Sequence, residues 1–501
     1  MVRAHDGGDG PALTQEQPGA DAPTRATRSR RIPLYVGLAL AALTIAGVVY
    51  LSTLDWTGPR RSALVLGMLR TQIIGGPVQI AIYVLAGASV VFLLLRRPTR
   101  RRIRVGLAAI VVGVILGDVV LLVLGVTNAL GVALSPGASA WTVLGFGAIA
   151  LAIVSFWSSP GWRTIGVAFA LVFVILAPTL GINAEFGLDP TAGSLAGVPT
   201  LDTVTLPVLR ALPRSIPTAG DDGSVWANWV HPQDLPGSGS ISQVIIPGTI
   251  SGFKARPAGL YLPPAALVKN PPDLPLVIMM MGQPGNPDPS FQQPILDQIA
   301  SRHDGLAPIV LVADQIGNPA VDTLCLNTHR YGNAETYITR DVVNWARTHL
   351  HVLQDAAHWT IAGYSNGGEC ALSLGARYPS IWRNVLDISG EEYPGWGGSA
   401  AALANTIPGG QAGYEATWPV NLLRHGTYPD TVGIFTVGSK DPAYRSQAIV
   451  VSAAAKAAHW HTTYFEIPGG GHVLDALNGG LAKGYAVLYP RLGLSKPGVA
   501  P

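Results

Sequence analysis

The sequence predicts a protein of two parts: an N-terminal transmembrane bundle of about five α-helices, and a C-terminal α/β domain with a mostly parallel sheet flanked by helices. Apolar runs of about 20 residues are concentrated before residue 181, and short strand patterns alternate with helical patterns after residue 240. The composition agrees with a part of the chain in the membrane, because 48% of the 501 residues are hydrophobic and only 13% are charged. A chain of this length also exceeds one ordinary domain.

Five apolar runs are each long enough to cross a hydrocarbon core about 30 Å thick. They cover residues 33–51, 78–95, 105–126, 138–156 and 164–180. They are almost free of charge, which favours membrane spans over helices buried in a soluble core. A polar stretch precedes the first run and no small-residue cleavage site follows it, so we expect it to stay in the membrane rather than act as a signal peptide.

Arginines that flank the runs predict their orientation, because cytoplasmic loops carry an excess of basic residues. Three groups fall on one side of the predicted bundle: Arg25, Arg28, Arg30 and Arg31; Arg96, Arg97, Arg100, Arg101, Arg102 and Arg104; and Arg163. A smaller group, Arg60, Arg61 and Arg70, falls on the other side. We therefore expect a cytoplasmic N-terminus and an extracytoplasmic location for everything after about residue 181. The net charge of +3 comes largely from these arginines, and we expect no nucleic-acid partner.

The chain divides into a disordered cytoplasmic tail (1–32), a transmembrane module (33–182), a linker (183–240) and the α/β domain (241–495). The linker is rich in Gly, Pro, Asp and Thr but contains apolar residues, so we expect it to pack partly on the α/β domain; contact with the lipid surface is the alternative. Asp118 lies inside the third run, and we favour a structural or helix-pairing role for it over transport.

Strand and helix patterns alternate along the α/β domain. Residues 244–250 and 258–262 are expected to form leading antiparallel strands, and the apolar run 274–281 a strand buried on both faces. Further strands are expected at 309–313, 358–364, 384–388, 432–437 and 463–467, and helices at 295–301, 334–350 and 473–488.

A nucleophile motif lies between a predicted strand and a predicted helix. It fits the pattern G-x-S-x-G, with the residues Gly363, Tyr364, Ser365, Asn366 and Gly367. In such an elbow a sharp turn lifts the serine Oγ out of the backbone, and small flanking residues avoid a clash. The order of strand, turn and helix predicts that Ser365 is a nucleophile.

Candidates for the acid and the base follow the serine in the order that this elbow requires. Asp441 comes just after the strand that ends near Val437, where its carboxylate can orient an imidazole. Asp430 and Asp475 are the alternatives for this role. His472 follows a Gly-rich loop after the last strand, which allows its imidazole to reach the serine and act as general base.

Acyl transfer also needs N–H donors aimed at the developing oxyanion. The backbone N–H of Asn366, directly after the nucleophile, is the first candidate. The second belongs to the loop after Met281, where Gln283 is preferred because Pro284 has no N–H.

The two cysteines, Cys325 and Cys370, both lie in the part expected outside the cytoplasm, where disulfides persist. We favour a disulfide between the loop after residue 313 and the helix behind the elbow, and two buried free thiols are the alternative. Neither cysteine has the Gly-rich turn of a nucleophile.

With these motifs in order, residues 241–495 resemble the α/β-hydrolase fold of the "putative esterase" family, which includes esterase D-like enzymes and the antigen 85 mycolyltransferases. The resemblance extends to three further segments: Cys325-Leu326-Asn327, Asn333-Ala334-Glu335-Thr336-Tyr337 and Asp387-Ile388-Ser389-Gly390-Glu391. It implies a serine nucleophile, a ping-pong acyl-enzyme route and no cofactor. Mycolyltransferases generally carry Glu as the acid, whereas this sequence offers Asp441, which argues against mycolyl transfer. The Ala/Gly/Arg-rich composition resembles that of a high-GC actinobacterial protein.

Together these features predict a membrane-anchored, extracytoplasmic serine ester hydrolase that acts on a lipid or cell-envelope ester. On location alone, aminoacyl-phosphatidylglycerol and acyl lipids rank above acylated glycans. Two alternatives stay open: an envelope acyltransferase of mycolyltransferase type, and a non-catalytic membrane scaffold with a hydrolase-like binding domain. The sequence contains no cluster with metal-ligand spacing, so we expect no metal.

Overall fold

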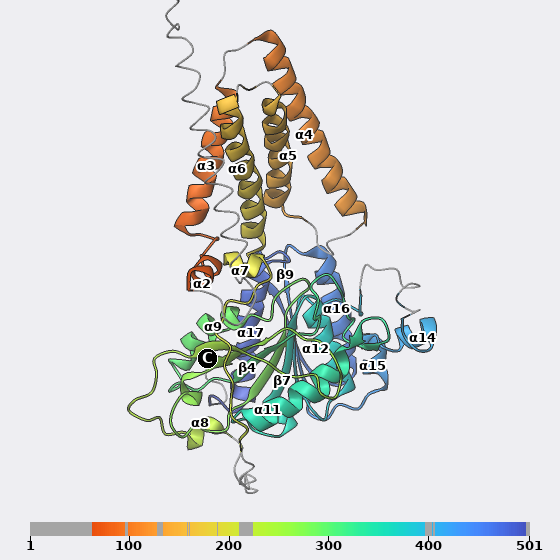
Figure 1. The fold of residues 1–501 in the computed structure, drawn as a ribbon. Helices are drawn as coiled ribbons and strands as arrows, with labels where there is room; N and C mark the ends of the chain where they lie inside the picture. Colours follow the sequence, from red (N-terminus) through yellow and green to blue (C-terminus); the bar gives the residue numbers. More distant parts are fainter. Residues whose placement is uncertain are drawn as a thin grey trace, which may run out of the picture.

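The computed structural model describes residues 63–95, 99–127, 134–157, 159, 161–187, 189–209, 224–395, 403 and 406–496. Figure 1 shows a bundle of long helices on one side of an α/β domain. The described part of the chain therefore has the two parts that the sequence predicts, and the segment after the bundle joins them.

Four described helices are long and apolar enough to cross a membrane. They are α3 (Pro77–Leu94), α4 (Arg100–Thr127), α5 (Pro136–Phe156) and α6 (Gly161–Phe186). Apolar side chains such as Ile80, Leu122 and Val172 are exposed on their outer faces, as expected of surfaces that face lipid. These helices indicate a multi-pass membrane protein and confirm four of the five predicted spans. The first, at 33–51, lies outside the described residues.

Small residues bring the bundle helices close together. A Cβ atom at Gly113 of α4 would lie only 2.4 Å from the carbonyl oxygen of Phe146 in α5, so glycine is required at this crossing. Asp118, five residues further along α4, is exposed on the helix surface. The helix pairing expected for Asp118 is therefore not seen among the described residues.

The α/β domain is built on an eight-stranded sheet with the order β1-β2-β4-β3-β7-β8-β9-β10. Strand β2 runs antiparallel to both of its neighbours, and the other neighbouring pairs are parallel. The strands are β1 (Ser240–Val244), β2 (Ala258–Leu262), β3 (Leu276–Met280), β4 (Ile309–Ala313), β7 (Trp359–Tyr364), β8 (Asn384–Ile388), β9 (Val432–Gly438) and β10 (His461–Ile467). Every residue of the central strands β3, β4, β7 and β8 is buried, which explains why β3 and β4 are apolar throughout.

Helices cover both faces of the sheet. A Cβ atom at Gly375 of α12 (Asn366–Arg377) would touch Val385, whereas one at Gly484 of α17 (Leu474–Arg491) would touch Leu386. Because neighbouring residues of a strand point to opposite faces, α12 and α17 pack on opposite faces of β8. The other helices of the domain include α9 (Gln293–Ala300), α11 (Val343–His349), α14 (Gly410–Glu415), α15 (Pro419–His425) and α16 (Pro442–Ala457).

Two predicted elements differ from the structure. The strand expected at 244–250 instead covers Ser240–Val244. After it the chain leaves the sheet and turns at Gly248, where a Cβ atom would lie 2.5 Å from the carbonyl oxygen of Phe253. The helix expected at 334–350 is helical throughout but contains a π-helical segment, Tyr337–Val342, between α10 (Ala334–Thr336) and α11. The other predicted strands and helices of this domain are present, with ends that differ by a few residues.

The segment that leaves the bundle packs on the α/β domain. Thr203 forms a parallel β-bridge with Gln243 of β1 and so extends the edge of the sheet. The backbone N–H of Ile73, just before α3, donates to the carbonyl oxygen of Pro190, just after α6 (2.9 Å). Arg70 pairs with Asp202 across 2.8 Å. These contacts join the ends of the membrane helices to the α/β domain.

Candidate active site

Ser365 lies on the sharp turn between β7 and α12, with φ 56° and ψ −124°. A Cβ atom at Gly363 would lie 1.7 Å from the carbonyl oxygen of Gly367, and one at Gly367 would lie 2.2 Å from that of Met280. Only glycine fits at either position, and the strained left-handed backbone at Ser365 is the conformation of a nucleophile elbow.

The structure brings Ser365, Asp441 and His472 together. His472 Nε2 lies 2.8 Å from Ser365 Oγ, and His472 Nδ1 lies 2.8 Å from Asp441 Oδ2. The imidazole and the carboxylate side chains are only 7% and 9% exposed. Each of the three residues follows the carboxyl end of a parallel strand, β7, β9 or β10, which places all three at one edge of the sheet.

The alternative acids lie elsewhere. Asp430 precedes β9, at the opposite end of that strand from Asp441, and its carboxylate pairs with Arg491 at 2.7 Å. Asp475 is exposed in the first turn of α17. Asp441 also caps α16, accepting from the N–H of Tyr444 through Oδ1, so the same carboxylate holds the helix and the imidazole.

Two tyrosine rings that the sequence analysis did not predict pack against the imidazole of His472. The ring of Tyr444 stacks on His472 with centroids 3.7 Å apart, and Tyr364 stacks at 5.3 Å. Burial and the nearby Glu391 raise the pKa of Tyr444 well above its ordinary value, while a hydrogen bond with Ser365 acts in the opposite direction. The phenol therefore stays neutral beside the serine. In the sequence, only the position of Tyr444, three residues after Asp441, could have indicated that its ring lies beside the imidazole.

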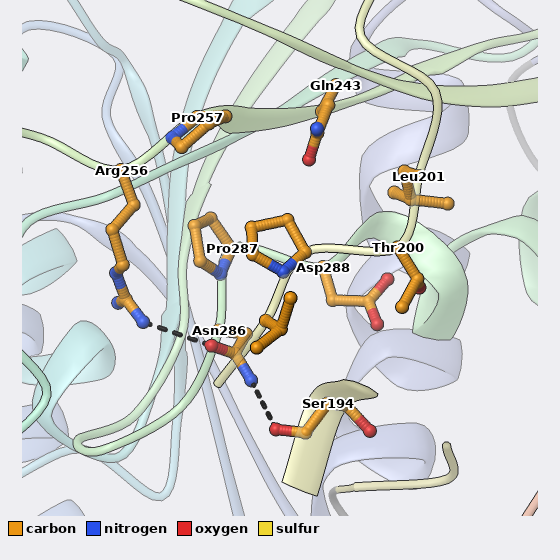
Figure 2. A pocket seen from close by; sticks show the side chains of 11 residues that line it. Ser194, Thr200, Leu201, Gln243, Arg256, Pro257, Asn286, Pro287 and Asp288 are labelled. Atoms are coloured by element: carbon orange, nitrogen blue, oxygen red, sulfur yellow. Dashed lines mark hydrogen bonds between the residues drawn. The ribbon is translucent and has the colours of Figure 1, made fainter. Parts of the chain in front are cut away.

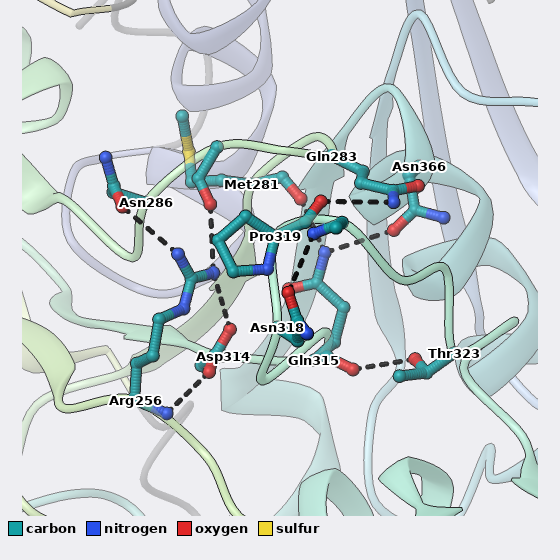
Figure 3. A network of polar contacts seen from close by, with 12 residues as sticks. Arg256, Met281, Gln283, Asn286, Asp314, Gln315, Asn318, Pro319, Thr323 and Asn366 are labelled. Atoms are coloured by element: carbon teal, nitrogen blue, oxygen red, sulfur yellow. Dashed lines mark hydrogen bonds and ion pairs between the residues drawn. The ribbon is translucent and has the colours of Figure 1, made fainter. Parts of the chain in front are cut away.

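The loop after β3 lies against the nucleophile. A Cβ atom at Gly282 would approach Ser365 Cβ to 3.0 Å, so the backbone that leads into Gln283 passes directly beside the elbow. The side chain of Gln283 donates from Nε2 to the carbonyl oxygen of Pro319 (3.2 Å; Figure 3). Asn366 occupies the first position of α12, where the N–H groups of a helix lack intrahelical partners.

Buried polar side chains support these two candidate donors (Figure 3). Gln315 donates from Nε2 to the carbonyl oxygen of Met281 and to Asn366 Oδ1. Asn366 Nδ2 in turn donates to Asp322 Oδ1 (3.1 Å). Gln315 therefore ties the loop after β3 to the start of α12, a connection that sequence motifs did not reveal because its residues are far apart in the chain.

A buried ion pair holds the later residues of the loop after β3. Arg256 forms an ion pair with Asp314 at 2.7 Å, and its guanidinium also donates to Gly285 O (2.9 Å) and Asn286 Oδ1 (3.1 Å). The Asp314 side chain is fully buried, so removal of this arginine would leave a buried carboxylate without its ion-pair partner. Figure 2 shows Asn286 continuing the chain of contacts to Ser194, in the segment that leaves the membrane bundle.

A disulfide joins Cys325 and Cys370, with Cα atoms 5.5 Å apart. Cys325 lies in the loop after β4, and Cys370 lies in α12 behind the nucleophile. Two carboxyl groups are buried in the same region. Burial raises the pKa of Glu369 to about 8 and that of Asp387 to about 7, so both favour the protonated form more than they do in water.

Residues 256–471 match the model of the family described as "Putative esterase". The C-terminal domain is an esterase-family hydrolase that acts on carboxylic esters. The matched range contains the elbow, the loop after β3 and Asp441, and His472 directly follows it.

The esterase domain and the helices before it have a relative in Corynebacterium glutamicum. The two proteins are 29% identical over 374 residues, which cover 72% of this chain and 84% of that uncharacterised protein. A match of this length exceeds residues 241–495, so it includes residues outside the esterase domain.

Solved structures are also similar to the esterase domain. They include an S-formylglutathione hydrolase from Agrobacterium tumefaciens (16% identity, TM-score 0.42, covering 52% of this chain and 98% of that one). They also include a ferulic acid esterase from Anaeromyces mucronatus (12% identity, TM-score 0.38, covering 52% and 94%).

Proposed function

We propose that this protein is a membrane-anchored, extracytoplasmic serine ester hydrolase that cleaves a lipid or cell-envelope ester through an acyl-enzyme. The observation that carries the proposal is the hydrogen-bonded series Ser365, His472 and Asp441, in an esterase-family domain that follows four apolar helices. Esters of membrane lipids, aminoacyl-phosphatidylglycerol and acyl lipids first among them, are the substrates that this location favours.

In the proposed mechanism Ser365 Oγ attacks the ester carbonyl while His472 Nε2 accepts the hydroxyl proton. The imidazolium then gives this proton to the departing alcohol, which leaves an acyl group on Ser365. Water then attacks the acyl carbonyl carbon while His472 accepts its proton. The bond between this carbon and Ser365 Oγ breaks, Oγ takes the proton back from His472, and the acid is released. Asp441 accepts from Nδ1–H throughout, which fixes the tautomer and stabilises the imidazolium.

The negative charge that develops on the carbonyl oxygen needs donors close to Ser365. We assign this role to the backbone N–H groups of Asn366 and Gln283. The first lies at the positive end of the α12 dipole, and the second follows Gly282, whose backbone lies against the serine. One such donor is worth about 3 kcal/mol of transition-state stabilisation.

An extracytoplasmic site is supported by two independent features. The arginine distribution favours a cytoplasmic N-terminus. The Cys325–Cys370 disulfide suits an oxidising compartment and is uncommon in the cytoplasm. An alkaline phosphatase fusion after residue 190 tests this orientation: an active fusion is expected, and an inactive one places the site in the cytoplasm.

Labelling of isolated membranes with a fluorophosphonate probe tests the nucleophile. The wild type is expected to be labelled and Ser365→Ala to remain unlabelled, whereas equal labelling refutes the assignment. Lipid extracts of cells with and without the protein then test the substrate class. The uncleaved ester is expected to accumulate without the protein, and unchanged lipid esters argue against a lipid substrate.

A further inference from the structure

A cavity of about 440 Å³ lies where the membrane helices meet the esterase domain. Ile74, just before α3, and Gly187, just after α6, line it from the membrane side. Ile295 of α9 and Leu474 of α17 line it from the esterase domain. Because α3 and α6 are candidate membrane spans, the cavity lies at the level where these spans leave the bilayer.

The cavity has the character of an apolar ligand site. Ser290, Gln298 and Asn478 are its only polar side chains among the described residues, and the other lining residues are aliphatic, aromatic, proline or glycine. Its volume falls within the range of about 300–1,000 Å³ that is usual for small-molecule sites. An apolar lining beside a bilayer favours a hydrocarbon occupant, because a polar one would lose its hydration without replacement hydrogen bonds.

The cavity is also close to the proposed base along the chain. Leu474 begins α17 only two residues after His472. A Cβ atom at Gly187 would lie 2.8 Å from Leu474 Cβ, so the backbone that leaves the membrane packs directly on the start of this helix. A lipid held here therefore lies between the bilayer and the loop that carries His472.

We propose that this cavity binds one acyl chain of a membrane lipid and so delivers the lipid's ester group from the bilayer to Ser365. Delivery of the ester rests on the proposed function. Binding of the acyl chain does not depend on cleavage and can be tested separately. The exposed amides of Gln298 and Asn478 mark the outer rim of the cavity, where a polar lipid headgroup finds hydrogen-bond partners.

Binding is tested with the full chain in nanodiscs that contain phosphatidylglycerol with a diazirine near the end of one acyl chain. The Ser365→Ala protein is used, so that turnover plays no part. Crosslinks are expected on α9 and α17, in addition to those that any bilayer lipid makes with α3–α6. Excess unlabelled phosphatidylglycerol is expected to compete for them. Crosslinks confined to α3–α6, or crosslinks on α9 and α17 that excess phosphatidylglycerol does not reduce, overturn the proposal.

Tryptophan substitutions that block the cavity are compared with a tryptophan substitution outside it. Asn478→Trp and Gln298→Trp each place a large ring at the rim, from an exposed position on a different helix, and at least a fivefold loss of α9 and α17 crosslinks is expected. Ala482→Trp, an exposed site on α17 outside the cavity lining, is the control and is expected to change labelling less than twofold. Equal labelling of the blocked and control proteins refutes the site.

Hydrolysis rates of proteins with Ser365 intact distinguish the proposed function from delivery of the lipid through the cavity. The rate on a lipid ester in nanodiscs, divided by the rate on p-nitrophenyl acetate, is expected to fall at least tenfold in Asn478→Trp and to stay within twofold in Ala482→Trp. If the crosslinks are found but no lipid ester is cleaved, the proposed function fails and the cavity remains a lipid site. If lipid is cleaved with an unchanged ratio in Asn478→Trp, delivery through the cavity fails and the proposed function stands.

Discussion

The side-chain amide of Asn286 donates to the carbonyl oxygen of Ser194 across 3.1 Å. Asn286 lies in the loop after β3, and Ser194 lies in α7 (Ala192–Leu195), just beyond membrane helix α6. The same asparagine accepts from Arg256 (Figure 2), which also donates to the carbonyl oxygen of Gly285 in this loop. The chain that leaves the membrane therefore touches the loop that supplies the proposed oxyanion donor.

Asn286→Asp is expected to lower kcat on a short soluble ester several-fold with little change in KM. The carboxylate still accepts from Arg256 but cannot donate to Ser194, so only the link to the membrane segment is lost. Asn286→Ala loses both contacts, and we expect a fall in kcat of about tenfold, because small displacements of catalytic groups have large effects on rate. Steady-state kinetics in nanodiscs measure this; equal kcat in all three proteins excludes a positioning role for Asn286.

Asp441→Asn is expected to lower kcat by about 10,000-fold. Its Oδ1 keeps the hydrogen bond from the N–H of Tyr444, so its NH2 group faces His472 and donates to Nδ1, which favours the wrong tautomer. Asp475→Asn is the matched control, since this carboxylate is exposed on α17, and it should retain nearly full activity. Hydrolysis of p-nitrophenyl acetate reports both rates. A small effect at Asp441 together with a large one at Asp475 would reverse the assignment.

Elements with strong local patterns could be predicted from the sequence. Strands β3 and β4 are continuous apolar runs, and the elbow motif together with the order Ser365, Asp441 and His472 led directly to residues that the structure brings together. The strand expected at 244–250 lies at Ser240–Val244, where it pairs with β2 on one side and bridges to Thr203 through Gln243 on the other. These are tertiary contacts without a local signal. The same holds for the Arg256–Asp314 pair, whose residues are 58 positions apart, and for the side chain of Gln315, whose partners lie 34 and 51 positions away.

Replacing both Cys325 and Cys370 with serine is expected to lower the free energy of unfolding of the esterase domain by about 4 kcal/mol. The disulfide closes a loop between residues 45 positions apart, and the loss follows from the loop-closure entropy of the unfolded chain. Thermal or urea unfolding with and without dithiothreitol measures it. Reductant should destabilise the wild type and leave the double variant unchanged; a wild type insensitive to reductant under unfolding conditions contradicts the prediction.

Glu369→Gln is expected to make the esterase domain less sensitive to pH. Burial raises the pKa of Glu369 to about 8 in the folded protein, above its ordinary value in the unfolded chain. The folded state therefore binds more protons than the unfolded state between about pH 4.5 and pH 8, so stability falls as the pH rises through this window. Glutamine keeps an oxygen that accepts from Ser373, without the ionisation.

Unfolding free energies of the two proteins at pH 5.5 and pH 8 test this linkage. The wild type should lose stability over the interval, by an amount of the order of a few kcal/mol, and Glu369→Gln should lose clearly less. Asp387, with its pKa raised to about 7, contributes to the slope that remains, so Asp387→Asn combined with Glu369→Gln should flatten it further. If both variants keep the slope of the wild type, these two carboxyl groups are not the source of the pH dependence.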